Sequence, residues 1–113
     1  MPYQPGDIVV TLFPFSDGPF YKERPALICA GPWRITPNIE VCWVAMITTT
    51  VLKGWPGDVE IPNLAKAGLP VESIVRSLKL TCIDTATTTK KAGMLDTRTL
   101  QKVLKHIKSH LEK

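Results

Sequence analysis

The chain has 113 residues, of which 44% are hydrophobic and 21% are charged. This length and composition predict a single domain over residues 1–113 and exclude a chain that is disordered overall. The longest apolar run, residues 41–47, is too short to cross a bilayer, and the first residues lack the features of a secretory signal. We therefore expect a cytoplasmic protein with no membrane association.

The formal net charge of +4 is unevenly distributed along the chain. Residues 90–113 contain seven Lys/Arg and two Asp/Glu, whereas residues 1–89 contain seven and eight. The basic C-terminal fifth favours a polyanionic or acidic partner, although a solvated helix face explains the same count. Cys29, Cys42 and Cys82 are an odd number of cysteines set among apolar residues, and we interpret them as reduced core thiols.

The first half of the chain predicts three strands. In residues 7–14 the even positions form an apolar row, which is typical of a half-buried strand. Residues 16–19 have turn chemistry and open a polar loop through Glu23. A second strand is expected from about Arg24 to Ala30, ending at residues 31–32, and a third from Ile39 to Thr48. Arg24 therefore lies where the loop meets the second strand.

The second half begins with short elements. Residues 58–61 alternate as a strand, and Asn63 and Gly68 could cap a brief helix over residues 64–67. A further strand starts at Ile74, where Arg76 interrupts an apolar row. Because a guanidinium in such a row needs a partner, Arg76 is either an ion-pair residue at the rim of the sheet or part of a site.

The last segment predicts an amphipathic helix over residues 97–113, with Asp96 as its N-cap. Its apolar positions share one face, and the basic ones lie opposite: Arg98, Lys102, Lys105 and Lys108. Five or six short strands, many turns and one terminal helix predict a mainly β fold. The expected architecture is a small curled sheet or barrel backed by the C-terminal helix.

Several common types of catalytic site have no counterpart in the sequence. It contains no Cys-x-x-Cys pair, no Gly-rich phosphate loop, no Gly-x-Ser-x-Gly and no His-Glu-x-x-His. His106 and His110 have a spacing that could share a zinc ion, but no third ligand is evident, so no metal is expected. Nucleophilic catalysis of the Ser/His/Asp type is also poorly supported.

What remains is a set of guanidiniums and hydroxyls near strand ends: Arg24, Thr48, Thr49, Thr50 and Arg76. Arginine offers a planar donor fork for phosphate, and threonine adds a short hydroxyl donor. The threonines have an alternative interpretation, because their β-propensity alone would place them in a strand.

Several segments resemble the MazF/PemK family of toxin endoribonucleases. The N-terminal match consists of Gly-Asp-Ile-Val-Val at 6–10, Phe-Pro-Phe-Ser-Asp at 13–17 and Lys-Glu-Arg-Pro-Ala-Leu-Ile at 22–28. It continues with Ile-Thr-Thr at 47–49, Ala-Gly-Leu-Pro at 67–70 and Ser-Ile-Val-Arg at 73–76. The resemblance covers nearly the whole chain and is loosest between residues 51 and 65.

This resemblance implies an SH3-like β-barrel of the CcdB/MazF/PemK type, with a short internal helix and a C-terminal helix. It also implies a homodimer with an RNA groove across the subunit interface, and a partner antitoxin with an acidic disordered tail. The implied activity is cleavage of single-stranded RNA without metal or other cofactor. The ribose 2′-hydroxyl attacks the adjacent phosphate and leaves 2′,3′-cyclic phosphate and 5′-hydroxyl ends.

By the same resemblance, Arg24 and Thr48 match catalytic residues, and the candidate RNA-binding residues are Lys22, Thr49, Arg76 and Lys79. One branch of the family has an aspartate as general base where this chain has Leu78, and a histidine in the loop corresponding to residues 16–23, which contains none here. The base is therefore open between Glu23, Asp17 and water. Four loop aromatics could stack on bases or pack as plugs: Phe20, Tyr21, Trp33 and Trp55.

Two other functions are compatible with this fold. Relatives that poison DNA gyrase end in Trp-Gly-Ile, whereas this chain ends in Leu-Glu-Lys, which argues against that activity. A barrel that binds RNA without cleaving it is the other alternative, which the leucine at position 78 leaves open.

Overall fold

The computed structural model describes residues 3–14 and 21–113. The strands within them are β1 (Asp7–Pro14), β2 (Tyr21–Thr36), β3 (Ile39–Thr49), β4 (Asp58–Glu60), β5 (Ser73–Asp84) and β6 (Thr88–Met94). The helices are α1 (Leu64–Ala67) and α2 (Thr97–His110), and the short 3₁₀ turns are η1 (Thr50–Leu52) and η2 (Thr85–Thr87). The turn expected at residues 16–19, with Asp17 and Phe20, lies outside the described residues.

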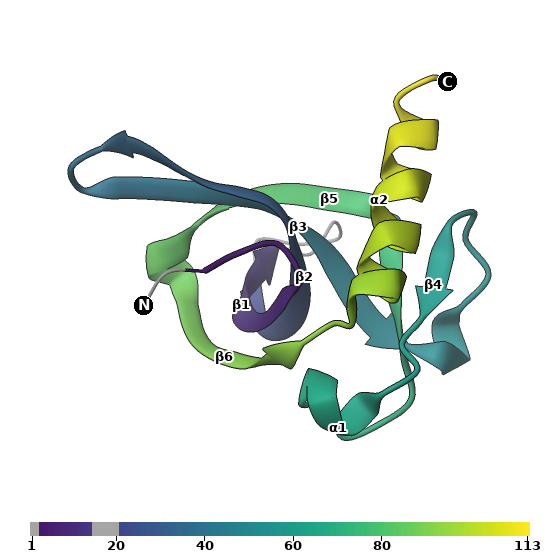
Figure 1. Ribbon diagram of the computed structural model, residues 1–113. Helices are drawn as coiled ribbons and strands as arrows, with labels where there is room; N and C mark the ends of the chain where they lie inside the picture. Colours follow the sequence, from purple (N-terminus) through teal and green to yellow (C-terminus); the bar gives the residue numbers. More distant parts are fainter. Residues whose placement is uncertain (1–2, 15–20) are drawn as a thin grey trace.

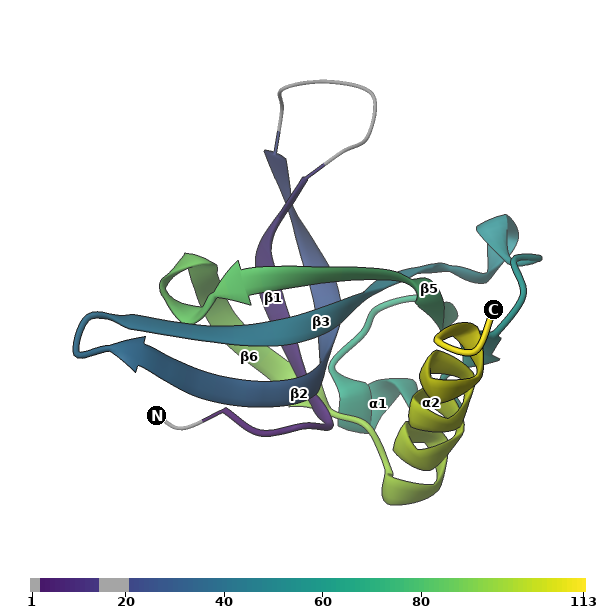
Figure 2. The same cartoon turned by 90° about the horizontal axis from the view of Figure 1, so that it is seen from above.

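The described strands form one antiparallel sheet in the order β4-β5-β3-β2-β1-β6 (Figure 1). The sheet curls strongly, but β4 and β6 remain its two edges, so the ladder of hydrogen bonds does not close. Helix α2 lies beside β5 and β4, and α1 lies near β6 (Figure 2). The predicted mainly β fold with a curled sheet and a C-terminal helix is confirmed.

The core has two clusters, which lie on opposite faces of the central strands. The first contains Ile8, Leu27 and Ile47 and is covered by α2, whose Val103 is fully buried. The second is built from strand residues of β1, β2, β3 and β5, among them Val9.

Ile8 and Val9 are neighbours and both buried, so the start of β1 is covered on both faces. Further along, the described part of the odd row stays buried whereas Leu12 of the even row is 42% exposed, so the prediction that the even row is the buried face was wrong beyond Ile8. The curl of the sheet encloses the odd row, which a sequence-local pattern does not reveal.

Strand β2 extends well beyond its predicted end. Gly31 and Pro32 do not stop it but lie where its register with β3 shifts between Ala30 and Trp33. Gly31 has φ +92°, a conformation that favours glycine, and a proline at a bulge need not donate to the ladder. The two strands then continue as a long hairpin that projects from the sheet (Figure 1).

The predicted helix caps are confirmed. The side chain of Asn63 accepts a hydrogen bond from the backbone N–H of Lys66 at 3.0 Å, and Gly68 ends α1 with φ +72°. Asp96 accepts from the N–H of Thr99 at 3.0 Å, so α2 begins where expected, although it ends at His110 and not at Lys113. Neither helix combines the length and apolar composition needed to span a bilayer.

All three cysteines are free, but they differ in exposure. Burial raises the pKa of Cys29 to about 12 and that of Cys42 to about 11. Cys82 is exposed, so its assignment to the core was wrong. It pairs across the ladder with the half-exposed Trp43.

Candidate active site

The two residues expected to carry catalysis lie on neighbouring strands. Strands β2 and β3 are antiparallel, with Leu27 opposite Ala45 and Ala26 opposite Met46. Continuing this register by two residues sets Arg24 opposite Thr48. Residues opposite one another in an antiparallel pair point to the same face, so the two side chains converge although 24 positions separate them in the sequence.

Arg24 and Thr48 line one cavity of about 210 Å³. Thr49 and Ser73 add two further hydroxyls, and the remaining walls are apolar: Pro25, Ile47, Leu69, Pro70 and Val71. Arg24 is the one charged residue among these lining residues. A guanidinium beside short hydroxyl donors, backed by apolar walls, suits a phosphate group with part of its hydration removed.

The segment before β5 forms one wall of this cavity and is tied to the end of β3. Ser73 pairs with Thr49 in the ladder, and its hydroxyl donates to the carbonyl of Val71 at 2.8 Å. The N–H of Thr50 donates to the carbonyl of Glu72 at 3.1 Å. Ser73 was not predicted as a site residue, and its place at the start of the Ser-Ile-Val-Arg segment at 73–76 was the one available signal.

The structure brings some of the other candidates to this cavity and not others. Thr49 lines it and is exposed. Lys22 lies two residues before Arg24 on β2, and its side chain is outside the described part of the chain. Arg76 and Lys79 are not among the residues that line the cavity. Lys79 and the exposed Leu78 lie in the stretch of β5 between Arg76 and Leu80, where the register of the β3–β5 ladder shifts.

Arg76 is held in a buried ion pair with Asp58. Its Nη2 lies 3.0 Å from Asp58 Oδ2 and its Nε donates to Oδ1 at 3.2 Å, while the two side chains are 7% and 8% exposed. Nη2 also donates to the carbonyl of Leu52 at 2.6 Å, and the guanidinium covers the ring of Trp55 at 4.2 Å. Of the two interpretations of Arg76, the structure shows the ion pair, which fixes the η1–β4 loop to β5.

The surroundings of Asp58 lower the pKa of its carboxyl group. Burial alone would raise this pKa. The hydrogen bonds from Arg76 and from two backbone N–H groups, together with the guanidinium charge, outweigh that effect and hold the pKa below its ordinary value. The carboxylate therefore stays ionised, as the buried guanidinium requires.

The two histidines join α2 to the sheet and to each other. Nε2 of His110 lies 2.9 Å from the hydroxyl of Ser77, which also donates to the carbonyl of Gly57 at 2.8 Å. The rings of His106 and His110 stack with centroids 6.4 Å apart. Among residues 3–14 and 21–113, no group of three or more His, Cys, Asp or Glu side chains is placed to hold a metal ion.

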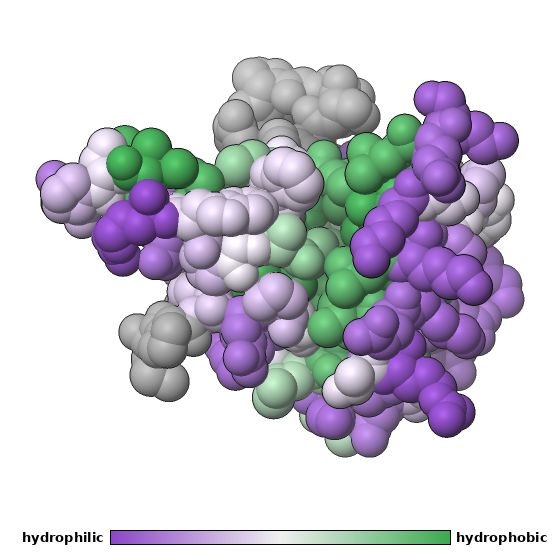
Figure 3. All heavy atoms as spheres, turned by 45° about the horizontal axis from the view of Figure 1, so that its top comes forward, coloured by the Kyte–Doolittle hydropathy of each residue, from purple (hydrophilic) through white to green (hydrophobic). Residues whose placement is uncertain are grey.

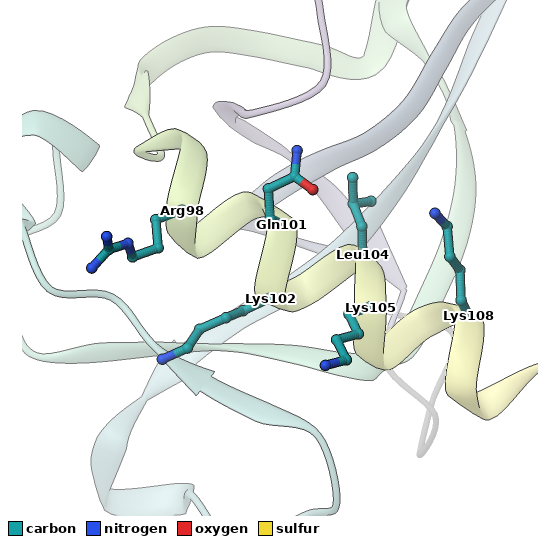
Figure 4. Close-up of a pocket in the computed structure, with 6 residues that line it drawn as sticks. All are labelled: Arg98, Gln101, Lys102, Leu104, Lys105 and Lys108. Carbon is teal, nitrogen blue, oxygen red and sulfur yellow. The ribbon is translucent and has the colours of Figure 1, made fainter.

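The solvent face of α2 carries the basic residues that the sequence placed there. They surround a shallow hollow of about 470 Å³, lined by Arg98, Gln101, Lys102, Leu104, Lys105 and Lys108. Figure 4 shows Arg98, Lys102 and Lys105 pointing to one side of the helix and Gln101, Leu104 and Lys108 to another. This surface, the α2 basic face, lacks the hydroxyl groups of the Arg24 cavity and offers charge alone to a polyanion.

A separate hydrophobic surface lies between the β2–β3 hairpin and α2 (Figure 3). It contains a hollow of about 290 Å³ lined by Trp43, Leu80, Thr81, Cys82 and Leu111. Trp33 extends this surface, since its ring packs edge-on against Trp43 with centroids 5.4 Å apart. Contiguous exposed apolar surface of this kind marks an interaction face in soluble proteins.

The family of the chain follows from a match to the model described as "PemK-like, MazF-like toxin of type II toxin-antitoxin system", which covers residues 4–111. The chain belongs to this family of toxins. The resemblance inferred from the sequence is thus confirmed.

Two solved structures share the fold over almost their whole lengths. The Mycobacterium tuberculosis toxin MazF-mt6 is 24% identical, with a TM-score of 0.66 over 96% of this chain and 97% of that one. MazF (Form-I) from Deinococcus radiodurans is 16% identical, with a TM-score of 0.68 over 99% and 97%. The predicted barrel type is confirmed, with the sheet left open. No curated protein sequence matches the chain.

Proposed function

We propose that this toxin is an endoribonuclease that cleaves single-stranded RNA at short sequences without a metal ion. Membership of the MazF/PemK family supports the proposal. The observation that carries it is that Arg24 and Thr48 line one cavity whose walls carry further hydroxyl groups. The implied cell compartment is the cytoplasm, where RNA and an antitoxin partner would both be present.

In the proposed reaction the substrate supplies its own nucleophile. The ribose 2′-oxygen attacks the adjacent phosphorus and the bond to the 5′-oxygen of the next nucleotide breaks. The leaving 5′-oxygen takes up a proton from water as the 2′-hydroxyl loses one, so the products are a 2′,3′-cyclic phosphate and a 5′-hydroxyl. Arg24 would donate two hydrogen bonds to the non-bridging oxygens, where negative charge grows in the transition state, and Thr48 would donate one to the same phosphate.

The proton of the 2′-hydroxyl needs an acceptor, and the described lining of the cavity contains no carboxylate or imidazole. Glu23 precedes Arg24 on β2, and successive side chains on a strand point to opposite faces. Leu78 lies away from the cavity and has no proton-accepting group. Water is therefore the base that the described geometry favours, while Asp17 lies outside the described residues.

Two kinds of surface, one basic and one hydrophobic, suit the expected protein partners. An antitoxin with an acidic disordered tail has a complementary target in the basic residues of α2 and in the Arg24 cavity. The hydrophobic surface around Trp43 and Leu111 offers a second copy of the chain a self-complementary contact, consistent with the homodimer that the resemblance implies. Both assemblies belong to the proposal.

The test is incubation of the purified protein with long single-stranded RNAs in EDTA, followed by mapping of 5′-hydroxyl ends. Loss of an oxyanion donor typically costs about 10²–10³ in rate, so Arg24→Ala should be nearly inactive. Thr48→Val keeps the side-chain shape without the hydroxyl, and its cleavage rate should fall by a smaller factor than that of Arg24→Ala. The matched control is Arg34→Ala, which removes an equal charge from the exposed Arg34–Glu40 pair on the hairpin.

Intact RNA across varied sequences would refute the proposed cleavage. Tight binding of an uncleavable 2′-deoxy oligonucleotide without turnover of the matching RNA would assign the chain to RNA binding alone. If Arg34→Ala lost as much activity as Arg24→Ala, net charge and not the cavity would explain the effect.

A further inference from the structure

The loop between β3 and β4 presents an aromatic ring in a fixed orientation. Trp55 is 47% exposed, and the guanidinium of Arg76 covers its ring at 4.2 Å. Asp58 Oδ2 accepts hydrogen bonds from the N–H groups of Gly54 at 3.0 Å and Trp55 at 3.1 Å. The buried Arg76–Asp58 pair therefore holds both the backbone and the ring of Trp55, so little conformational entropy remains to be lost when a ligand stacks on the indole.

Trp55 forms one wall of a hollow of about 380 Å³, here called the Trp55 hollow. Lys53 and Glu60 also line it, and Lys53 Nζ lies 3.3 Å from Glu60 Oε1. Both side chains are more than half exposed, so a ligand can replace their mutual contact at small cost. The hollow thus combines an aromatic face with one cationic donor and one carboxylate acceptor.

A smaller hollow of about 140 Å³ shares lining residues with both the Trp55 hollow and the Arg24 cavity. This middle hollow shares Ser73 with the Arg24 cavity and shares Lys53 and Glu60 with the Trp55 hollow. The three hollows are therefore neighbours on the surface, here called the track, and one end of the track is the candidate active site. The loop that carries Trp55 directly follows the strand that carries Thr48.

The charges along this track differ from those of the Arg24 cavity. Lys53 and Glu60 line both the middle hollow and the Trp55 hollow, with Glu72 added in the first and the Arg76-paired Asp58 in the second. Because Lys53 is paired with Glu60, neither hollow offers a phosphate an excess of positive charge, whereas the carboxylates can accept hydrogen bonds from the N–H groups on the edge of a base. The track therefore suits an unpaired base and not the phosphate backbone.

We propose that the Trp55 hollow binds one RNA base next to the cleaved phosphodiester, by stacking on Trp55 and hydrogen bonding to Lys53 and Glu60. This inference rests on the proposed ribonuclease function. Guanine makes the most hydrogen bonds there. Its N1–H and N2–H are adjacent donors for the two carboxylate oxygens of Glu60, and its O6 accepts from Lys53. Adenine, cytosine and uracil each have a single hydrogen-bond donor group for that carboxylate on the same edge.

The cleavage assay tests the subsite through three variants. Losing one base stack should lower kcat/KM of Trp55→Ala at preferred sites by about 5- to 150-fold, whereas Trp55→Phe should keep most activity. Glu60→Gln should weaken the preference for guanine, because one carboxylate acceptor becomes a donor. Trp55→Phe is the matched control for Trp55→Ala, because it keeps an aromatic ring in the hollow.

A binding assay that needs no catalysis separates this inference from the proposed function. In a Trp33→Phe/Trp43→Phe background, Trp55 is the single remaining tryptophan. Uncleavable 2′-O-methyl tetrauridylate, with one position replaced by guanosine, adenosine or cytidine, is titrated while indole fluorescence is recorded. We expect quenching by the base stacked on Trp55, with the guanosine oligonucleotide binding several-fold more tightly than the others.

Unchanged fluorescence at saturation, or wild-type sites and rates in Trp55→Ala, would overturn the subsite and leave the ribonuclease proposal standing. Conversely, quenching by the guanosine oligonucleotide from a protein that never cleaves RNA would support the subsite and refute catalysis. Equal binding of all four oligonucleotides with quenching would refute the role of Lys53 and Glu60. A thermal melt of Trp55→Ala close to that of Trp55→Phe excludes misfolding as the cause.

Discussion

Replacing Asp58 by asparagine should be one of the most damaging single changes outside the apolar core. The substitution leaves the Arg76 guanidinium 7% exposed and without its counter-charge. Breaking one side of a buried pair costs about 3–5 kcal/mol. Because the carbonyl of Leu52 and the ring of Trp55 still contact the guanidinium, we expect the lower end, about 3 kcal/mol. For a domain of this size that loss lowers Tm by about 12 °C.

The effect should depend on pH in a defined direction. The pKa of Asp58 lies below its ordinary value of 3.8 in the folded protein. A depressed carboxyl pKa contributes stability in full above the ordinary value, and this contribution is lost as pH falls through the folded value. The difference in unfolding free energy between wild type and Asp58→Asn should therefore be constant at neutral pH and shrink below pH 3.8.

Urea unfolding at fixed protein concentration, at pH 7 and at a series of acid pH values, measures this difference. The double variant Asp58→Leu/Arg76→Met removes both charges and should be much more stable than Arg76→Met alone, which strands the carboxylate. A loss below about 1 kcal/mol in Asp58→Asn at pH 7 would refute the reasoning, since exposed pairs contribute that little. A difference that persists unchanged in acid would refute the assignment to the ion pair.

Three further predictions concern separate features. Gly57→Ala should destabilise the fold by about 2 kcal/mol in thermal unfolding, because φ is +81° and a Cβ there would lie 2.7 Å from His110 Nε2. An unchanged Tm would contradict the close packing of Gly57 against His110. Among the three thiols, Cys82 should be alkylated first by iodoacetamide, as measured by peptide mass mapping. Modification of Cys29 or Cys42 before Cys82 would contradict their burial. Glu23→Gln should change the RNA cleavage rate by less than about threefold if Glu23 points away from Arg24. A loss of rate as large as that in Arg24→Ala would instead identify Glu23 as the base.

Features that depend on a few neighbouring residues were predictable from the sequence. The Asn63 and Asp96 caps and the end of α1 at Gly68 use side-chain and backbone chemistry within four positions. The convergence of Arg24 and Thr48 followed from a resemblance, and the register of β2 with β3 supplies its physical reason. These predictions did not require knowledge of how the sheet curls.

Features set by distant pairing were not predictable. The sequence could not choose between an ion pair and a site role for Arg76, because its partner Asp58 lies 18 positions away on β4. Likewise, nothing local shows that the start of β1 is covered on both faces or that Ser73 joins the cavity through its pairing with Thr49. Each of these depends on the register between strands, which a pattern of hydrophobic residues within one strand leaves open.

The charge pattern of the track gives a reason for the register that RNA would adopt on this surface. Arg24 is the one charged group lining the cavity beside Thr48, and the hollows that lead away from it are lined by Glu60 and Glu72. The further hollows offer a phosphate no excess of positive charge, since Lys53 there is paired with Glu60, whereas the N–H groups of a base can donate to their carboxylates. A phosphate is therefore favoured in the Arg24 cavity and a base in the Trp55 hollow. In the proposed ribonuclease, cleavage at a defined base then follows from the different charges of the Arg24 cavity and the Trp55 hollow. It needs no nucleophilic side chain.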